Sequence, residues 1–346
     1  MKTLVWNSAE KMDWEERDVI APAEDEVLLR VEAVGICGSE IEGYLGHNSL
    51  RIPPLVMGHE FSGRIEQMGS GVDRAGELLP GMKVAINPLL FCGRCRSCRR
   101  GLTQLCDERK IIGIHRAGAF AEYVAVPTSA LIAIPEEVDR FRASLAEPLA
   151  CSLRATRRAM TEHPFANVLI YGAGGIGLLC SMIARLLGAA RITMVDTNEE
   201  RLDKALLIGV DAGINPKHND ADKRILEENS DKGIDIVIDC AGFQPTRESA
   251  IRLLNPGGVL MNIGLGVDRT FLPINVAIRK EIEIVSSFCY TQQDFKDAVD
   301  LLISGKVTEQ GWTEVRPLSE GAAAFADLVA GRVTNGKIFL DPQGGL

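Results

Sequence analysis

Four cysteines crowd into residues 92–106 of this 346-residue chain. Loops of two, two and seven residues separate them, so the four thiolates can meet at one point. Tetrahedral zinc takes four such ligands at about 2.3 Å, and four cysteines leave no coordination position open. The spacing therefore predicts a structural zinc site with the ligands Cys92, Cys95, Cys98 and Cys106.

A second group of possible ligands is dispersed along the sequence. Cys37 lies in a Gly-Ile-Cys-Gly-Ser-Glu stretch, His59 and Glu60 follow a glycine, and Glu147 precedes a proline. Soft, imidazole and carboxylate ligands with one vacant position are typical of a catalytic zinc site. A lone cysteine, histidine or glutamate is more often structural, so spacing alone leaves the role of this group open.

A glycine-rich pattern follows an apolar run near the middle of the chain. Gly172-x-Gly174-x-x-Gly177 comes after Val-Leu-Ile-Tyr and precedes an apolar helical pattern. The first glycine permits a tight turn, the second lets backbone approach a pyrophosphate, and the third lets helix and strand pack closely. Asp196, nineteen residues later, can accept hydrogen bonds from a ribose and repels a 2′-phosphate, which favours NAD over NADP. Arg201 could stack on adenine or instead bind such a phosphate.

The elements that must position these residues are of two kinds. Up to about residue 150, short strands separated by turns indicate a mostly β domain, and beyond it strands alternate with helices. Such alternation predicts right-handed crossovers and a doubly wound parallel sheet. The expected strands are 27–34, 61–68, 83–88, 119–126, 168–171, 192–196, 234–239, 259–263, 282–286 and 337–340, and the expected helices are 177–187, 199–208, 246–254, 293–303 and 320–329.

Composition and charge exclude several classes of protein. With 38 basic and 47 acidic side chains the formal charge is −9, which argues against nucleic acid as the main partner. Four arginines in the cysteine-rich stretch suggest a zinc-ribbon reader, but in so acidic a chain they are better explained as a solvated surface. Nine cysteines, an odd number, suit a reducing compartment, and no apolar segment predicts a leader or a membrane span. We therefore expect a cytoplasmic protein.

Together these motifs resemble the zinc-dependent medium-chain dehydrogenases. The stretch Gly58-His-Glu-Phe-Ser-Gly-Arg-Ile-Glu-Gln-Met-Gly-Ser-Gly-Val72 is similar to the zinc signature of that family, and the remaining motifs occur in the family's order. The resemblance covers essentially the whole chain. Within the family, the sequence is most similar to polyol dehydrogenases such as sorbitol and galactitol-1-phosphate dehydrogenases.

The resemblance implies an α/β chain with a GroES-like, mostly β catalytic domain and a Rossmann domain. The catalytic domain would comprise residues 1–152 and 287–346, with a structural zinc lobe at about 90–108, and the Rossmann domain residues 153–286. It also implies two zinc ions per chain, NAD, and a homodimer or homotetramer.

The same resemblance assigns roles to individual residues. Cys37, His59 and Glu147 would surround the catalytic zinc, with Glu60 a ligand in some members, and Ser39 would begin the proton relay. The remaining matches are to cofactor-contacting positions: Gly172, Gly174, Gly175, Ile176, Gly177, Asp196, Arg201, Cys240, Gly264, Leu265 and Phe288.

The predicted activity is hydride transfer from a secondary alcohol, a sugar alcohol or its phosphate, to NAD, giving a ketone. Zinc would lower the pKa of the bound alcohol, and the alkoxide would expel hydride. Two alternatives stay open: a dehydrogenase of a short diol or amino alcohol, and a non-catalytic cofactor-binding protein on the same fold. The complete ligand set argues against the second alternative and against a metal-free quinone reductase.

Some positions depart from the family and bear on the substrate. Glu40 replaces the usual Asp, and Glu42 and Gly43 stand where sorbitol dehydrogenase has a His and a Tyr. Cys289 replaces an arginine that contacts polyol there, which argues against a sorbitol dehydrogenase. His115 and Arg116 could line the mouth of the cleft, where a cation would bind a phosphate or carboxylate, although residues of this kind are more often exposed loop residues.

Overall fold

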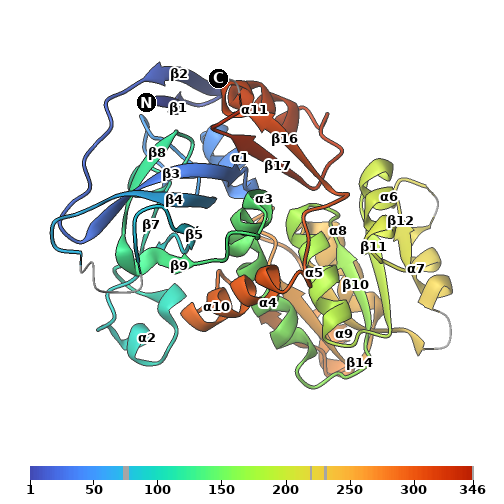
Figure 1. Ribbon diagram of the computed structural model, residues 1–346. Helices are drawn as coiled ribbons and strands as arrows, with labels where there is room; N and C mark the ends of the chain where they lie inside the picture. The colour runs from blue at the N-terminus through green and yellow to red at the C-terminus, as the bar shows by residue number, and fades with distance from the viewer. Residues whose placement is uncertain (73–77, 219, 230–231, 345–346) are drawn as a thin grey trace.

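The computed structural model of the protein describes residues 1–72, 78–218, 220–229 and 232–344. Figure 1 shows two units: a mostly β unit in blue, green and red, and an α/β unit in yellow-green and orange. The helices α3 (Arg140–Ser144) and α4 (Ala146–Met160) lie between them. The fold class predicted from the sequence is confirmed.

The β unit is built on a seven-stranded sheet with the order β16-β17-β3-β4-β5-β9, and β8 also pairs with β3. The last strand in the chain, β17, pairs antiparallel with β3 through Phe339 opposite Gly35 and Leu340 opposite Val34. Residues from the carboxyl end of the chain thus complete a sheet begun near the amino end (Figure 1). The strands of this unit are β1 (Lys2–Ser8), β2 (Lys11–Glu16), β3 (Glu26–Gly35), β4 (Glu60–Met68), β5 (Lys83–Ile86), β6 (Leu89–Leu90), β7 (Lys110–Ile111), β8 (Tyr123–Pro127), β9 (Leu131–Ala133), β16 (Thr313–Pro317) and β17 (Lys337–Asp341), and its helices are α1 (Gly38–Tyr44), α2 (Arg96–Arg99) and α11 (Gly321–Val329).

The α/β unit has six parallel strands in the order β12-β11-β10-β13-β14-β15. The strand order reverses between β10 and β13, and in doubly wound sheets this switch point lies beside the ligand crevice. Its strands are β10 (Asn167–Tyr171), β11 (Arg191–Val195), β12 (Ala212–Ile214), β13 (Ile234–Asp239), β14 (Leu254–Asn262) and β15 (Glu283–Ser286), and its helices are α5 (Gly175–Leu186), α6 (Glu199–Leu207), α7 (Ala221–Asn229), α8 (Gln244–Leu253) and α9 (Ile274–Arg279).

Helix α4 joins the two units, and the sequence pattern did not predict it. Pro148 lies in its first turn, where a missing N–H costs nothing because that group has no partner within the helix. The helix packs against α5 and α10 (Gln292–Ile303), and it also contacts β4 and β5 of the other sheet. Glu147 is thereby held at the junction of the two units.

Most predicted elements are present, with shifted ends. The expected strand 119–126 begins only at Tyr123, because residues before it hydrogen-bond to the loop before β4 instead, among them Ala119 N–H to the Gly58 carbonyl. None of the helices in the described ranges is long and apolar enough to cross a membrane. All nine cysteines fall in these ranges, and none forms a disulfide.

Candidate active site

The four predicted zinc-lobe cysteines come together. Their sulfur atoms all lie within 4.8 Å of one another, and Cys106 Sγ is 3.6 Å from Cys92 Sγ. Backbone N–H groups of the same loops donate to these sulfurs, for example Cys98 N–H to Cys95 Sγ at 3.4 Å. These bonds lower the pKa of Cys95 to about 6, while burial raises that of Cys98 to about 12. Four thiolates this close need a cation, and an all-sulfur set fits zinc with no position left open.

The dispersed group also comes together, from two elements of the β unit. Cys37 is the N-cap of α1, and His59 and Glu60 stand where β4 begins. Their ligand atoms lie within 4.8 Å of one another. Gly58 makes this possible: its φ is +100°, and a Cβ there would lie 2.7 Å from the Phe120 backbone nitrogen.

The Glu40 side chain orients this cluster. Its Oε1 accepts from the Gly58 N–H at 2.7 Å and lies 2.9 Å from His59 Nδ1, and its Oε2 accepts from the Cys37 N–H at 3.0 Å. With Nδ1 donating to Glu40, the other ring nitrogen of His59 is left for a metal. Burial by itself would raise the pKa of Glu40, but the charges of His59 and Arg51 hold it below its ordinary value. Glu40 therefore remains a carboxylate that fixes the imidazole.

Two carboxylates compete for the third ligand position. Glu60 Oε2 lies 2.5 Å from Lys337 Nζ, which also donates to the Ile36 carbonyl. Glu147 is not among the residues whose ligand atoms meet within 4.8 Å. Burial raises its pKa to about 7, against the charge of His59 and together with that of Glu60. The geometry thus favours Glu60 as the direct ligand and puts Glu147 beside the site.

The donor set fits zinc. A thiolate, an imidazole and one carboxylate are three protein ligands, which is the number that a catalytic zinc site provides when its fourth position is open. Ser39 stands next to that set, with its hydroxyl donating to Cys37 Sγ at 3.4 Å. The catalytic and structural metal sites therefore differ in donor type and in openness.

The glycine pattern forms a turn between β10 and α5. Gly172 has a φ of +101°, and a Cβ on Gly177 would lie 1.8 Å from the Gly172 carbonyl oxygen. A Cβ on Gly174, the N-cap of α5, would meet nothing within 4 Å. The start of α5 is thus a cradle open to an incoming group, and free N–H groups at a helix start attract phosphate. The arrangement fits a dinucleotide.

Asp196 follows β11 at the same edge of the sheet. Its carboxylate accepts from the Ala173 N–H at 2.7 Å and from the Asn198 N–H at 2.9 Å. A cavity of about 510 Å³ next to it is lined by Arg201 and Phe243 among others. Arg201 donates to the Val333 carbonyl at 3.0 Å, and its Nε has no partner in the described ranges. Both residues proposed to recognise the adenosine half thus line one cavity.

Four more of the predicted cofactor residues follow the carboxyl ends of β13, β14 and β15: Cys240, Gly264, Leu265 and Phe288. Gly264, Leu265 and Phe288 line a second cavity of about 460 Å³, and the Leu265 and Phe288 side chains are exposed. Cys240 lies against Gly172, whereas Ile176 and Gly175 are half-buried in the first turn of α5. The two cavities thus lie at one edge of the parallel sheet, where doubly wound folds bind ligands.

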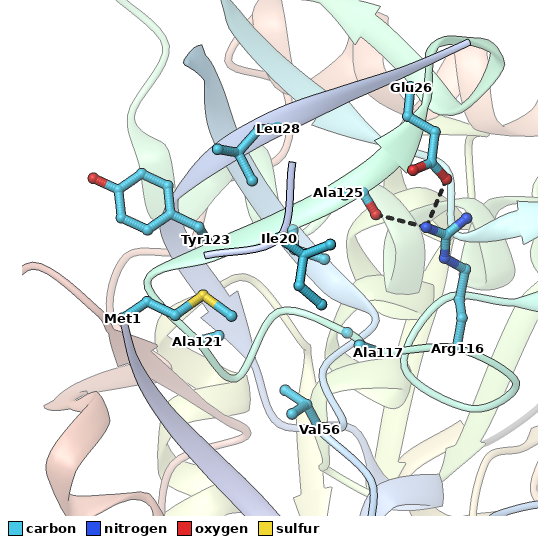
Figure 2. A pocket seen from close by; sticks show the side chains of 12 residues that line it. Met1, Ile20, Glu26, Leu28, Val56, Arg116, Ala117, Ala121, Tyr123 and Ala125 are labelled. Carbon is cyan, nitrogen blue, oxygen red and sulfur yellow. Dashed lines mark hydrogen bonds and ion pairs between the residues drawn. The ribbon is translucent and has the colours of Figure 1, made fainter. Parts of the chain in front are cut away.

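Arg116 does not take up the possible substrate role at the mouth of the cleft. Its guanidinium pairs with Glu26 at 2.7 Å and donates to the Ala125 carbonyl at 2.9 Å (Figure 2). These residues line a pocket of the β unit that contains none of the predicted metal ligands. His115 is exposed, and its Nδ1 accepts from the Ile111 N–H. In the zinc lobe Arg94 pairs with Glu108 in solvent, as expected of a surface arginine.

Three residues of the site were missed by reasoning from the sequence. Lys337 contacts Glu60, and Arg51 contacts Ser39. Phe243 lines the same cavity as Asp196. Lys337 begins a strand that looked only structural, and Arg51 stands in a loop with no motif. Phe243 directly follows the Cys-Ala-Gly turn, and that position was the one available signal.

Comparisons with known proteins agree with this geometry. Residues 175–304 match the zinc-binding dehydrogenase family, and residues 23–136 match the alcohol dehydrogenase GroES-like domain. D-xylulose reductase A of Aspergillus oryzae is 33% identical over 336 residues, which cover 94% of this chain and 90% of that protein. The prediction of the family from the sequence is confirmed.

Solved structures extend over nearly the whole chain. The crystal structure of galactitol-1-phosphate dehydrogenase from Escherichia coli has a TM-score of 0.89 and 29% identity, with 99% of this chain and 100% of that chain covered. A structure described as a zinc-binding dehydrogenase from Sinorhizobium meliloti 1021, bound to NADP, has a TM-score of 0.91 and 29% identity, with 99% of each chain covered.

Proposed function

The chain belongs to the zinc-containing alcohol dehydrogenase family, and from this premise we propose that it oxidises a secondary alcohol of a sugar alcohol, or of its phosphate, to a ketone with NAD as the hydride acceptor. The observation that carries the proposal is the three-ligand set of Cys37, His59 and Glu60 beside the Ser39 hydroxyl. The matched relatives include a xylulose reductase and a polyol-phosphate dehydrogenase, which supports this substrate class.

Each part of the site has a distinct task. Cys37, His59 and Glu60 would hold zinc, which would polarise an alcohol oxygen, and the glycine turn would hold the pyrophosphate of NAD, whose nicotinamide would accept the hydride. Ser39 is placed to receive the alcohol proton, because its hydroxyl already lies against Cys37. Glu40 fixes the imidazole. Glu147, in the first turn of α4, is buried beside the site.

We propose NAD as the preferred cofactor because Asp196 lines the cavity next to the glycine turn, where its carboxylate would accept hydrogen bonds from the ribose and repel a 2′-phosphate. The relative from Sinorhizobium meliloti is bound to NADP, so both cofactors belong in the test. A ratio of kcat/KM that favours NAD in the wild type and falls in Asp196→Ala would support the assignment.

We also propose the domain limits 1–152 with 287–346 and 153–286, because β17 returns to the first sheet while β15 ends the second. A homodimer or homotetramer is the expected state. The edge strand β15 carries the exposed Ile284, and Ile278 and Phe271 nearby in the sequence are also exposed. Light scattering on purified protein will measure the mass directly.

The test of the activity is NAD reduction at 340 nm with zinc-loaded protein. The panel comprises alditols, alditol phosphates, inositols, short diols and amino alcohols, each assayed with wild type and with Cys37→Ser. Turnover of alditols or their phosphates that is lost in Cys37→Ser supports the proposal. Turnover confined to the short diols or amino alcohols would refute the substrate class while retaining the dehydrogenase chemistry.

A further inference from the structure

Arg51 is a buried cation with few partners. It lies in the loop between α1 and β4 and is 3% exposed. Its Nη2 donates to the Ser39 hydroxyl oxygen at 3.2 Å, but its Nε and Nη1 have no hydrogen-bond partner in the described ranges. A guanidinium carries five N–H donors and keeps its proton at any ordinary pH, so it cannot relieve burial by becoming neutral.

This cation stands beside the reaction centre. The Ser39 oxygen that accepts from Arg51 lies 3.4 Å from Cys37 Sγ, so one hydroxyl links the guanidinium to the metal ligands. Ser39 is half-buried, and the neighbouring Gly38 is exposed with open space beside its Cα. Ser39 therefore lies between the Arg51 guanidinium and the Cys37 sulfur.

Gly43 makes room for the arginine. A Cβ at position 43 would lie 2.5 Å from Arg51 Cδ and 3.1 Å from Arg51 Nε. The missing side chain and the buried guanidinium are thus a single feature of this chain.

No carboxylate within the described ranges forms an ion pair with Arg51. The Glu40 oxygens are close enough for Arg51 to lower the Glu40 pKa, but they accept from Gly58, Cys37 and His59 instead. Removing a charge from water without a paired partner is costly, so the site is electrostatically incomplete without an anion.

Arg109 is a second arginine with a nitrogen that is unpartnered in the described ranges, its Nε. Its guanidinium lies 4.9 Å from the centre of the Phe288 ring. Phe288 lines the cavity at the carboxyl ends of β14 and β15, so Arg109 adds a positive charge beside that cavity. A positive charge favours an anion over a neutral group nearby.

We propose that Arg51 binds an anionic group of the substrate, a carboxylate or a phosphate, next to the hydroxyl that is oxidised. The proposal rests on the proposed function and narrows its substrate to acid-bearing polyols, such as aldonates and alditol phosphates. Nη1 and the second proton of Nη2 form the end-on fork that such oxygens accept. Ser39 then contacts the reacting end of the molecule and Arg51 its charged end.

The test compares three ligands with one carbon chain: glucitol, gluconate and glucitol 6-phosphate. Zinc-loaded wild type, Arg51→Met, Arg51→Lys and the control Arg116→Met are assayed for kcat/KM with NAD. Binding of each ligand is also measured without turnover, as the rise in melting temperature in the absence of NAD. Arg116 is a matched control because it is a half-buried arginine of the same unit paired with Glu26.

We expect wild type to favour one of the two anions over glucitol, and that anion alone to raise the melting temperature strongly. Arg51→Met should lose about 100-fold in kcat/KM for the anion and less than about 3-fold for glucitol, since a hydrogen bond to a charged group is worth that factor. Arg51→Lys keeps the charge without the fork and should lose about 10-fold. Whether gluconate or glucitol 6-phosphate responds identifies the anion as carboxylate or phosphate.

Equal losses for all three ligands in Arg51→Met would mean that Arg51 only positions Ser39, and would overturn the proposal. Loss in Arg116→Met as large as in Arg51→Met would do the same. If no ligand is turned over, the proposed function fails. The melting temperatures then test the anion site independently of turnover. Stabilisation by an anion that Arg51→Met abolishes would still support the anion site, whereas no stabilisation by either anion would refute it.

Discussion

The two cysteine-containing sites of this protein contrast in how they are built. The structural site draws all its ligands from fifteen consecutive residues, and the loops that carry the thiols also donate N–H groups to the sulfurs. The catalytic site draws its ligands from the start of α1 and the start of β4. The Glu40 carboxylate of α1 and the Lys337 amine of β17 hold them in place. The first is closed and locally determined, whereas the second is open and determined by the fold.

This difference indicates which of the two sites can affect substrate specificity. A closed four-cysteine site leaves nothing for a substrate to contact, so its loops serve stability. An open site depends on supporting residues such as Glu40 and Lys337, which tune it without touching the metal. Changes of substrate therefore arise in the support around the open site.

The substitution Cys37→Ser tests the open site and should have the largest effect on activity. Polarisation of the alcohol is worth several kcal/mol, so we expect kcat to fall at least about 1000-fold. The zinc content should fall from two to one per chain, with little change in melting temperature. Metal analysis measures the zinc content, and NADH absorbance measures kcat. Activity within tenfold of wild type would show that Cys37 is not a ligand.

Cys98→Ser should have the opposite profile. The Cys98 side chain is buried in the lobe, and loss of a structural metal is a loss of folding free energy. We expect one zinc to be lost and the melting temperature to fall by roughly 5–10 °C, which corresponds to several kcal/mol in a chain of this size. Hydrogen exchange should quicken over residues 92–106. An unchanged exchange rate in that stretch would argue against a structural role.

Glu60→Gln and Glu147→Gln separate the two candidate carboxylates. Because Glu60 lies within the ligand cluster, its replacement should weaken zinc at the catalytic site by about 100-fold, whereas Glu147→Gln should weaken it by no more than about 10-fold. Competition with a chelator measures both constants. The reverse order would make Glu147 the direct ligand.

Glu147 also predicts a pH dependence of stability once zinc is removed. The Glu147 pKa is raised from its ordinary value to about 7, so the fold favours the protonated carboxyl. Its contribution is therefore complete below the ordinary value of 4.5 and is lost as the pH rises to about 7. Urea unfolding of metal-free protein should show stability falling over that window, and Glu147→Gln should flatten the slope. A slope as steep in Glu147→Gln as in wild type would assign it to another group.

The same contrast explains what could be predicted from the sequence. The zinc lobe and the glycine turn were predictable because their residues are neighbours in the chain and their spacing carries the geometry. Helix α4 could not be predicted because Pro148, in its first turn, is a residue that usually argues against a helix. Strand β17 could not be assigned to a sheet because it pairs with β3, which lies far away in the sequence. The choice between Glu60 and Glu147 depends on Lys337, which lies far along the chain. Arg51 has no pattern of its own, and only packing against Gly43 reveals it.

The substitution with the smallest expected effect, Glu40→Asp, tests most directly whether the two metal sites are independent. Glu40→Asp keeps the charge but shortens the side chain that reaches His59 Nδ1, the Gly58 N–H and the Cys37 N–H. If the open site is held by this support, the shorter carboxylate must lose at least one of these bonds. We expect about 10-fold weaker zinc at the catalytic site and a similar loss of kcat. The lobe, which shares none of these contacts, should keep its zinc, so chelation should show one unchanged and one weakened site. Equal weakening of zinc binding at both sites would mean that the two sites are coupled through the β unit and are not independent.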